Sequence, residues 1–212
     1  MSGTRITRRH ALIAVAAFGA AAVPLGAGKA FADTRAPKLY IDPGHGGSDS
    51  GAVGNGLEEK ALTLDISLQV NHILTSNFDV ETRMSRTDDA TVSLDQRTSD
   101  ANSWGANFFV SIHINSGGGT GFESYRHPSA GSDTVNAHNI LHPAIMAKMG
   151  GVTDRGQKTA NFHVLRETAM AAILTENLFI DTAADADRLK DPAFITAAAQ
   201  GHADGIAQLM GL

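Results

Sequence analysis

Residues 108–115 read FFVSIHIN, and this stretch decides the fold class. It is nearly continuous in apolar and β-branched residues, a pattern typical of a strand that is buried on both faces of a sheet. A strand buried in this way belongs to a parallel sheet with helices on both sides. The sequence therefore predicts a central strand over Phe108–Ile114, with His113 near its carboxyl end.

The segments around this strand alternate between strand and helix patterns. Short apolar or alternating runs predict strands at residues 39–42, 78–86, 121–126, 161–165 and 171–176. Apolar residues at helical spacing and capping residues predict helices at residues 58–74, 93–104, 134–148 and 192–210. We therefore expect an α/β fold, a three-layer domain with a twisted, mostly parallel sheet of about six strands flanked by helices.

The composition limits both the size of the fold and its chemistry. The chain has 212 residues, of which 42% are hydrophobic, enough for one domain with a real core. It has no cysteine, which excludes a disulfide scaffold, a cysteine-containing zinc site, a cysteine nucleophile and an iron–sulfur cluster. Any metal site must therefore be built from His, Asp and Glu.

The first 32 residues differ in character from the rest. They contain an apolar run at residues 11–23 and an Ala-Phe-Ala cleavage pattern at residues 30–32, which together predict a signal peptide over residues 1–32. The run is too short for a membrane span, which takes about 18 or more apolar residues. Arg8 and Arg9 resemble a twin-arginine signal, so we expect export by that route to the periplasm, cell wall or exterior. Residues 33–212 would form a single catalytic domain.

Charge is distributed unevenly along the chain. Four of the 17 basic residues and none of the 22 acidic residues lie in residues 1–32, so the remainder is strongly acidic. Nucleic acids and anionic lipids are bound through basic stripes. We therefore expect neither as the main partner.

Several residues capable of catalysis come at the ends of predicted strands. His45 follows the first strand, His113 ends the central one, and Glu176 ends the strand at 171–176, while Glu59 lies in the first turn of a helix. Open α/β sheets bind ligands beyond the carboxyl ends of their strands. Two imidazoles and a carboxylate form a common open zinc shell, and a second carboxylate beside the metal can act as a general base.

At these positions the sequence resembles the zinc-dependent N-acetylmuramoyl-L-alanine amidases of the amidase_3 type, found in cell-wall autolysins and phage endolysins. The likeness extends over nearly all of residues 39–212. Its segments lie at residues 41–47, 51–60, 85–88, 94 with 97, 110–115, 154–156, 162–166 and 174–180.

The resemblance implies a role for each of the four residues. His45, Glu59 and His113 correspond to the ligands of one zinc ion, and Glu176 corresponds to the catalytic carboxylate. Glu59 is chosen over its neighbour because the liganding glutamate of the family directly precedes a lysine, as Glu59 does here. The implied reaction hydrolyses the amide that joins the lactyl group of N-acetylmuramic acid to the L-alanine of the peptidoglycan stem peptide. Zinc would polarise the carbonyl and water, and Glu176 would pass a proton to the leaving amine.

Three further residues are candidates for binding substrate or supporting the site. Arg166 is a candidate for a bidentate grip on a stem-peptide carboxylate, and Asn115 is a second candidate for substrate binding. Asp42 is a candidate for fixing a loop amide or a ligand imidazole. His138 and His142 are interpreted as a solvated helix face. His72, His127 and His202 are interpreted as polar surface.

The chain departs from the family pattern at a few positions. Ser50 and residues 171–172 replace common prolines, and Asn177-Leu178 follows Glu176 where a glycine is usual before Phe179. None of these changes removes a ligand atom, but Asn177-Leu178 could alter the loop beside the base. Some relatives have a long insertion that covers the zinc. Residues 113–154 have room for only one strand and one helix, so we expect no inhibitory lid, and a monomer that acts alone.

Two other functions remain open from the sequence. A zinc peptidase or deacetylase acting on wall material could use the same shell of two histidines and one acid. A non-catalytic wall-binding module could keep the fold. It would gain nothing, however, from Glu176.

Overall fold

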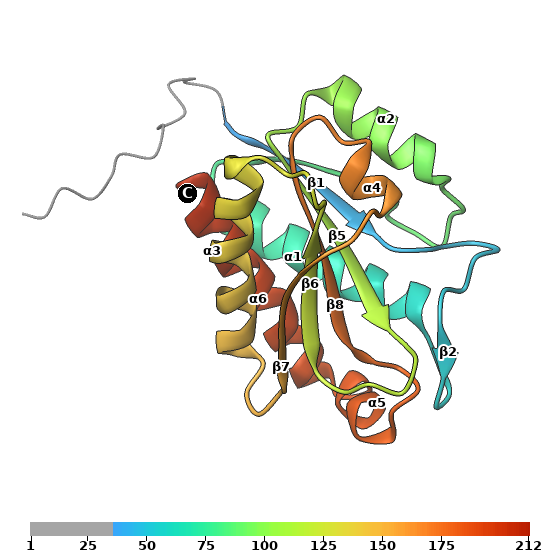
Figure 1. The fold of residues 1–212 in the computed structure, drawn as a ribbon. Helices are drawn as coiled ribbons and strands as arrows, with labels where there is room; N and C mark the ends of the chain where they lie inside the picture. The colour runs from blue at the N-terminus through green and yellow to red at the C-terminus, as the bar shows by residue number, and fades with distance from the viewer. Residues whose placement is uncertain (1–35) are drawn as a thin grey trace, which may run out of the picture. The chain divides into compact units, whose positions relative to one another are not determined.

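The structure, a computed structural model, describes residues 36–212 (Figure 1). The predicted signal peptide at residues 1–32 lies outside the described residues. The main sheet has six strands in the order β4-β1-β5-β8-β6-β7. Their bounds are β1 Lys38–Pro43, β4 Glu81–Met84, β5 Phe108–Asn115, β6 Phe122–Arg126, β7 Asp154–Thr159 and β8 Ala171–Phe179.

The direction of the strands confirms a mostly parallel sheet. β4, β1, β5 and β8 run parallel to one another. β6 runs antiparallel to β8, and β7 runs parallel to β6, so the last two strands are reversed. The predicted central strand, β5, lies between β1 and β8 as expected.

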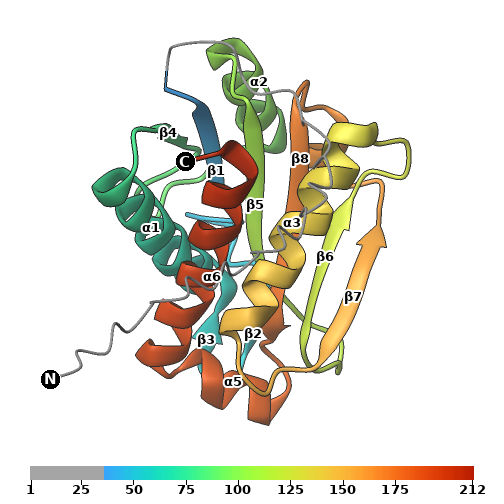
Figure 2. The same ribbon diagram turned by 90° about the vertical axis from the view of Figure 1, so that its left-hand side faces the viewer.

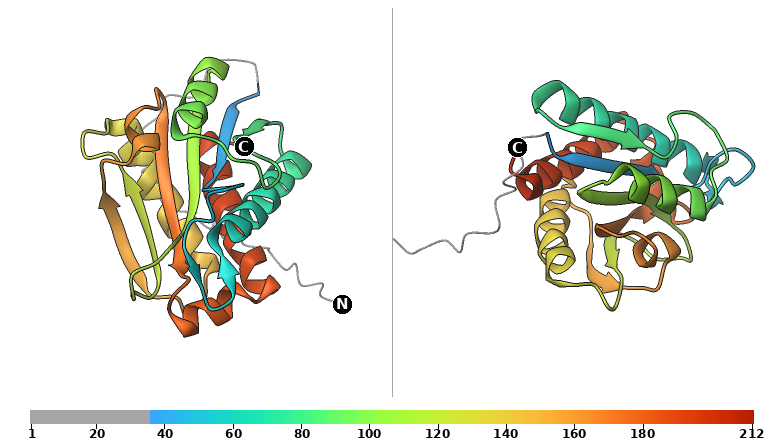
Figure 3. Two further views of the ribbon diagram at one scale, coloured as in Figure 1. Left: turned by 90° about the vertical axis from the view of Figure 1, so that its right-hand side faces the viewer. Right: turned by 90° about the horizontal axis from the view of Figure 1, so that it is seen from above.

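Helices cover both faces of the sheet and make the domain three-layered. One face carries α1 (Glu59–Asn77), α3 (Ser132–Lys148) and α6 (Pro192–Met210), which lie side by side over the sheet in Figure 2. The other face carries α2 (Leu94–Trp104) and the single turn α4 (His163–Arg166), as Figure 3 shows. α5 (Ala183–Leu189) connects β8 to α6. Among residues 36–212, no helix is long and apolar enough to cross a membrane.

The apolar pattern of the sequence matches the two cores. The larger core packs α1, α3 and α6 on the sheet through fully buried residues such as Ile66, Leu141 and Ile206. On the opposite face Tyr40 stacks on Phe109, with ring centroids 5.5 Å apart. Because β5 contributes to both cores, its sequence is nearly continuous in apolar residues.

The predicted starts of α2 and α6 are confirmed by their caps. The Ser93 hydroxyl accepts a hydrogen bond from the backbone N–H of Gln96, and the Gln96 side chain accepts one from the backbone N–H of Ser93. This reciprocal pair satisfies two N–H groups at the start of α2 that would otherwise lack a partner. At α6, Asp191 caps the N-terminus and Pro192 occupies the first turn.

The strand predicted at residues 161–165 is wrong. These residues form the approach to α4 and most of that turn, and the strand in this region is β7, at Asp154–Thr159. β7 has the polar sequence DRGQKT and lies at the edge of the sheet formed by residues 36–212, where it pairs with β6. An edge strand with exposed side chains does not need the apolar residues that mark a buried strand.

The interpretation of three histidines as surface residues is also wrong. His138, His142 and His202 are buried, with at most 4% of their surface exposed. His142 Nε2 lies 2.9 Å from Asp154 Oδ1, and the Ser124 hydroxyl lies 2.6 Å from both His142 Nδ1 and His138 Nε2. His202 contacts Thr175 and the Ala198 carbonyl. Ser124, Asp154 and Thr175 belong to strands of the sheet, so the helix pattern alone did not reveal the burial.

These buried histidines predict a loss of stability in acid. Burial lowers the pKa of His138 and that of His202 to about 4, below the usual value of about 6.5 in an unfolded chain. The folded state then binds fewer protons than the unfolded state between these pH values, so stability falls as the pH falls below about 6.5. Each of these two histidines should lower the free energy of unfolding by about 2 kcal/mol as the pH falls from 7 to 5. Urea unfolding should show a smaller pH dependence in His138→Gln than in wild type. Equal pH dependence in His138→Gln and wild type would contradict this prediction. His72→Gln is the control, because His72 is exposed.

Candidate metal centre

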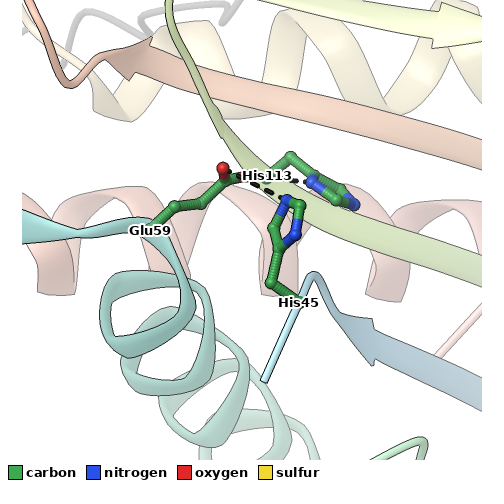
Figure 4. A group of neighbouring side chains, drawn as sticks. All are labelled: His45, Glu59 and His113. Carbon is green, nitrogen blue, oxygen red and sulfur yellow. Dashed lines mark hydrogen bonds and ion pairs between the residues drawn. The ribbon is translucent and has the colours of Figure 1, made fainter. Parts of the chain in front are cut away.

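His45, Glu59 and His113 come from three different elements and meet at one point (Figure 4). His45 lies in the loop after β1, His113 lies near the carboxyl end of β5, and Glu59 is the first residue of α1. Each element therefore presents its residue at the same edge of the sheet. This is the edge at which open α/β folds bind ligands.

A short hairpin brings Glu59 into place. β2 (Val53–Gly54) and β3 (Leu57–Glu58) pair antiparallel across the two-residue turn Asn55-Gly56. Both turn residues have positive φ, 51° and 78°, as a tight hairpin of this kind requires. β3 ends at Glu58, and α1 begins at the next residue, Glu59. The hairpin was not predicted, although Asn-Gly was a usable signal.

The ligand atoms are close together. His113 Nδ1 lies 2.9 Å from Glu59 Oε1, and His45 Nε2 lies 3.2 Å from Glu59 Oε2. One potential ligand atom from each of the three residues lies within 4.8 Å of the others. Two imidazole nitrogens and one carboxylate oxygen at this spacing fit a zinc ion that keeps an open position.

Two glycines allow this close approach. A Cβ atom at Gly44 would lie 2.4 Å from the His113 ring, and one at Gly51 would lie 2.6 Å from both the Glu59 carboxylate and the His45 ring. His45 itself has φ of 62°, in the left-handed region that non-glycine residues rarely adopt. The backbone around the site is therefore shaped to place these three side chains.

Other groups fix the direction of two of the candidate ligands, His45 and Glu59. Asp49 Oδ2 accepts a hydrogen bond from His45 Nδ1 at 2.8 Å, which leaves His45 Nε2 facing Glu59. The Glu59 carboxylate accepts hydrogen bonds from the backbone N–H groups of Ala52 and Ile114, at 2.8 and 3.0 Å. The contact of Asp49 with His45 was not predicted from the sequence, because an acidic residue in a loop gives no periodic pattern.

The charges at the site suit a cation. Burial alone would raise the pKa of Glu59, but the two histidines hold it well below its usual range. Burial lowers the pKa of His45, and the contacts with Glu59 and Asp49 outweigh that effect and raise it to about 9. The pKa of His113 is raised by Glu59 and Glu176, also against the effect of burial. Without a metal the His45 imidazole therefore carries a proton at neutral pH, which a bound cation would displace.

Asp42 supports the loop through an arginine and touches neither imidazole ring. Its carboxylate accepts hydrogen bonds from Arg97 Nη1 at 2.6 Å, Ser85 Oγ at 2.6 Å and Ser111 Oγ at 2.7 Å. Arg97 also donates to the carbonyl oxygens of Pro43 and His45, both at 2.7 Å. Asp42 and Arg97 are both buried, so this ion pair holds the strained His45 backbone in a dry environment.

A second buried arginine holds the other side of the same loop. Arg86 donates to the carbonyl oxygens of Pro43, Gly44 and Lys60, at 3.2, 2.8 and 2.8 Å. These bonds join the loop after β1 to the first turn of α1, and therefore His45 to Glu59. Both arginines belong to segments of the family resemblance, but the sequence assigned them no role.

Glu176 lies beside the three candidate ligands on the neighbouring strand. It is the partner of His113 across β5 and β8, and the register shifts directly after this pair. At the shift, Leu178 has φ of 70°, and the Asn177 side chain donates to the His113 carbonyl at 2.9 Å. The Asn177-Leu178 departure noted in the sequence is thus a bulge that leaves Glu176 in place.

The Glu176 carboxylate has an unusual environment. Its Oε2 atom is buried and has no hydrogen-bond partner among residues 36–212. Burial raises the pKa of Glu176 to about 7; His113 opposes this rise, and Glu59 and Glu123 add to it. A carboxylate whose pKa lies near neutrality suits general acid–base chemistry.

These residues open into a cleft of about 540 Å³. His45, His113 and Glu176 line the cleft, together with the start of α2 and the segment at residues 162–164. Its lining includes the exposed apolar residues Leu94 and Phe162, with 53% and 38% of their surface accessible. The cleft is therefore large enough for an extended ligand and is partly apolar.

The side chains of Arg166 and Asn115, the two candidates for substrate binding, form hydrogen bonds with other residues of the protein. The Arg166 guanidinium bonds Glu167 Oε1 at 2.7 Å and Asn161 Oδ1 at 2.8 Å, and it lines a separate cavity. The Asn115 amide donates to Glu123 Oε1 at 2.8 Å. Their roles in substrate binding remain predictions.

Comparisons with known proteins agree with one another. The family model Amidase_3, described as N-acetylmuramoyl-L-alanine amidase, matches residues 39–208. The chain is 56% identical over 176 residues to the sporulation-specific N-acetylmuramoyl-L-alanine amidase of Bacillus subtilis, covering 82% of this chain and 69% of that protein.

Solved structures show the same similarity. The N-acetylmuramoyl-L-alanine amidase of Clostridium difficile 630 superposes with a TM-score of 0.81 at 32% identity, covering 84% of this chain and 98% of that one. The catalytic domain of CwlV, an N-acetylmuramoyl-L-alanine amidase of Paenibacillus polymyxa, gives a TM-score of 0.75 at 40% identity, covering 82% and 98%.

Proposed function

We propose that His45, Glu59 and His113 hold one zinc ion and that Glu176 is the catalytic carboxylate. The proposal follows from the family, because the chain belongs to the Amidase_3 family of N-acetylmuramoyl-L-alanine amidases. The reaction is hydrolysis of the amide between the lactyl group of N-acetylmuramic acid and the L-alanine of the stem peptide. Its substrate is peptidoglycan.

One observation carries this proposal. The buried Glu176 Oε2 atom has no hydrogen-bond partner in the described part of the chain, and its residue is paired across the sheet with His113. A buried carboxylate oxygen without a partner costs stability, so its retention indicates that the partner comes with the substrate. A wall-binding module without catalysis would have no use for such a group.

The side chains supply distinct steps. A zinc ion, when bound, supplies Lewis-acid chemistry that polarises the scissile carbonyl and acidifies water. Glu176 accepts the proton of the attacking water at its carboxylate and transfers it to the L-alanine nitrogen as the C–N bond breaks. Asp49 orients His45, and the backbone N–H groups of Ala52 and Ile114 orient Glu59. The cleft walls orient the substrate and limit the access of bulk water.

Digestion of purified peptidoglycan tests the proposal directly. We expect mass spectrometry to detect free stem peptides that begin with L-alanine. A chelator should abolish the release, and added zinc should restore it. Release of D-alanine or acetate would instead indicate a peptidase or deacetylase. Intact zinc binding without any product would indicate a binding module. Either result would overturn the proposal.

We also propose export through the twin-arginine route and action without an activating partner. Residues 113–154 form β6 and α3, and α3 packs against α6 on the sheet face away from α2 and α4. This segment therefore supplies no cover for the cleft. Normal export of an Arg8→Lys/Arg9→Lys variant would exclude the route. A strong rate increase with a division-site activator would exclude independent action.

A further inference from the structure

A row of charged residues continues from the candidate metal centre across the sheet. Glu176 on β8 has His113 as its partner on β5 and Glu123 as its partner on β6. β7, the next strand, supplies Arg155 and Lys158. Figure 2 shows β5, β8, β6 and β7 in this order. Partner residues on adjacent strands project to the same face, so the row lies on one side of the sheet.

Glu123 is the centre of this extension. Its side chain is only 3% exposed, yet four donors reach it. Oε1 accepts from Tyr125 Oη at 2.5 Å and from Asn115 Nδ2 at 2.8 Å. Oε2 accepts from Arg155 Nε at 2.6 Å and from Lys158 Nζ. Burying a carboxylate is unfavourable unless it is paired in this way, so the cluster is a built feature of the fold.

The two cations are held rigidly and keep donors to spare. The Arg155 guanidinium lies over the Phe179 ring, 4.8 Å from its centroid, and Lys158 Nζ lies 5.9 Å from the Tyr125 ring centroid. Both side chains are about one-third exposed. Within residues 36–212, the terminal Arg155 nitrogens have no hydrogen-bond partner, and Lys158 Nζ donates only to Glu123. Two cations against the one carboxylate of Glu123 leave a net positive charge around Glu123, which is the cross-strand partner of Glu176.

We propose that Arg155 and Lys158 form a subsite that binds a free carboxylate of the stem peptide, on the leaving side of the scissile amide. The inference rests on the proposed function, because it takes Glu176 as the point where the amide is cleaved. The muramoyl side of that amide is neutral near the bond, whereas the stem peptide carries carboxylates. A fixed arginine beside a lysine suits a carboxylate, through charge-assisted hydrogen bonds.

The distances are compatible with the second residue of the stem peptide. Adjacent strands lie about 4.8 Å apart, so β7 lies about 10 Å from β8. An extended peptide covers about 3.5 Å per residue. From β7, the Arg155 guanidinium reaches the Phe179 ring on β8, 4.8 Å from its centroid. The α-carboxylate of the second residue therefore comes within range of Arg155 and Lys158. Arg166 fits this role less well, because Glu167 and Asn161 already occupy its guanidinium.

Paired substrates separate carboxylate binding from a structural role. Soluble, uncrosslinked peptidoglycan chains are prepared with the α-carboxylate of the second stem residue either free or amidated, and kcat and KM are measured on both. The variants are Arg155→Gln and Lys158→Gln, with Arg155→Lys as the conservative change. Lys148→Gln is the control, because Lys148 forms an exposed ion pair with Asp204 on the α3/α6 face. Thermal unfolding and zinc affinity establish that each variant is folded.

The proposal predicts a substrate-dependent loss. Arg155→Gln and Lys158→Gln should each raise KM about tenfold on the free-carboxylate chains, with little change in kcat. On the amidated chains they should behave as wild type does, and Arg155→Lys should keep most of the preference for the free form. Equal losses on both substrates, or none on either, would overturn the subsite. Failure of wild type to release L-alanyl peptides from either substrate would instead contradict the proposed function.

Discussion

Replacement of Glu176 by glutamine should reduce kcat on peptidoglycan by about a thousandfold, because positioned general acid–base groups contribute about 10²–10⁴ to a rate. The amide has nearly the same size as the carboxylate but cannot accept the proton of the attacking water. Glu176 is not one of the three candidate ligands, so its loss should leave zinc affinity unchanged. Steady-state kinetics and a zinc competition titration measure the two effects.

A matched control separates catalysis from a general effect of charge. Glu81 is an exposed glutamate on the edge strand β4, so Glu81→Gln removes the same charge far from the cleft. We expect it to leave kcat unchanged. Retention of more than a tenth of the wild-type kcat by Glu176→Gln would contradict the assigned mechanism.

Replacement of Arg97 by methionine should cause a large fall in the free energy of unfolding. The substitution keeps the aliphatic part of the side chain but leaves Asp42 as a buried carboxylate with only hydroxyl partners. Removal of one partner from a buried ion pair costs about 3–5 kcal/mol. The His45 carbonyl also loses its donor, so the zinc dissociation constant should rise about tenfold or more.

Urea unfolding of the metal-free protein and a zinc titration check both effects. Arg83→Met is the control, because Arg83 pairs with Asp100 at 2.8 Å on the surface, where each side chain is more than 40% exposed. Such surface pairs contribute at most about 1 kcal/mol. If Arg97→Met loses no more stability than Arg83→Met and binds zinc as wild type does, Arg97 does not support the site.

Local patterns predicted most of the elements that carry the site. β5 is buried on both faces, so its apolar sequence identified it, and Ser93 as a cap and Pro192 in a first turn marked the starts of α2 and α6. His45, Glu59, His113 and Glu176 follow strands or begin a helix. The general rule that ligands bind at the carboxyl ends of strands therefore brought them together before any distance was known.

The features that the sequence missed depend on neighbours far along the chain. β7 is polar because it is an edge strand, which only the strand order reveals. His138 and His142 are buried because Ser124 on β6 and Asp154 on β7 supply their hydrogen bonds. The sequence around Glu123 does not indicate a buried charge cluster, because its partners Arg155 and Lys158 lie on another strand. Such pairings are set by tertiary structure and leave no periodic trace.

The zinc affinities of Glu59→Gln and Glu58→Gln test whether His45, Glu59 and His113 form the metal centre. The two residues are neighbours, but Glu59 is buried between His45 and His113, whereas Glu58 is exposed and lies 3.7 Å from Lys60. We expect Glu59→Gln to weaken zinc binding by about a hundredfold or more, because a candidate metal ligand is lost. Glu58→Gln should bind zinc as wild type does. Equal affinities in the two variants would show that His45, Glu59 and His113 do not form the metal centre.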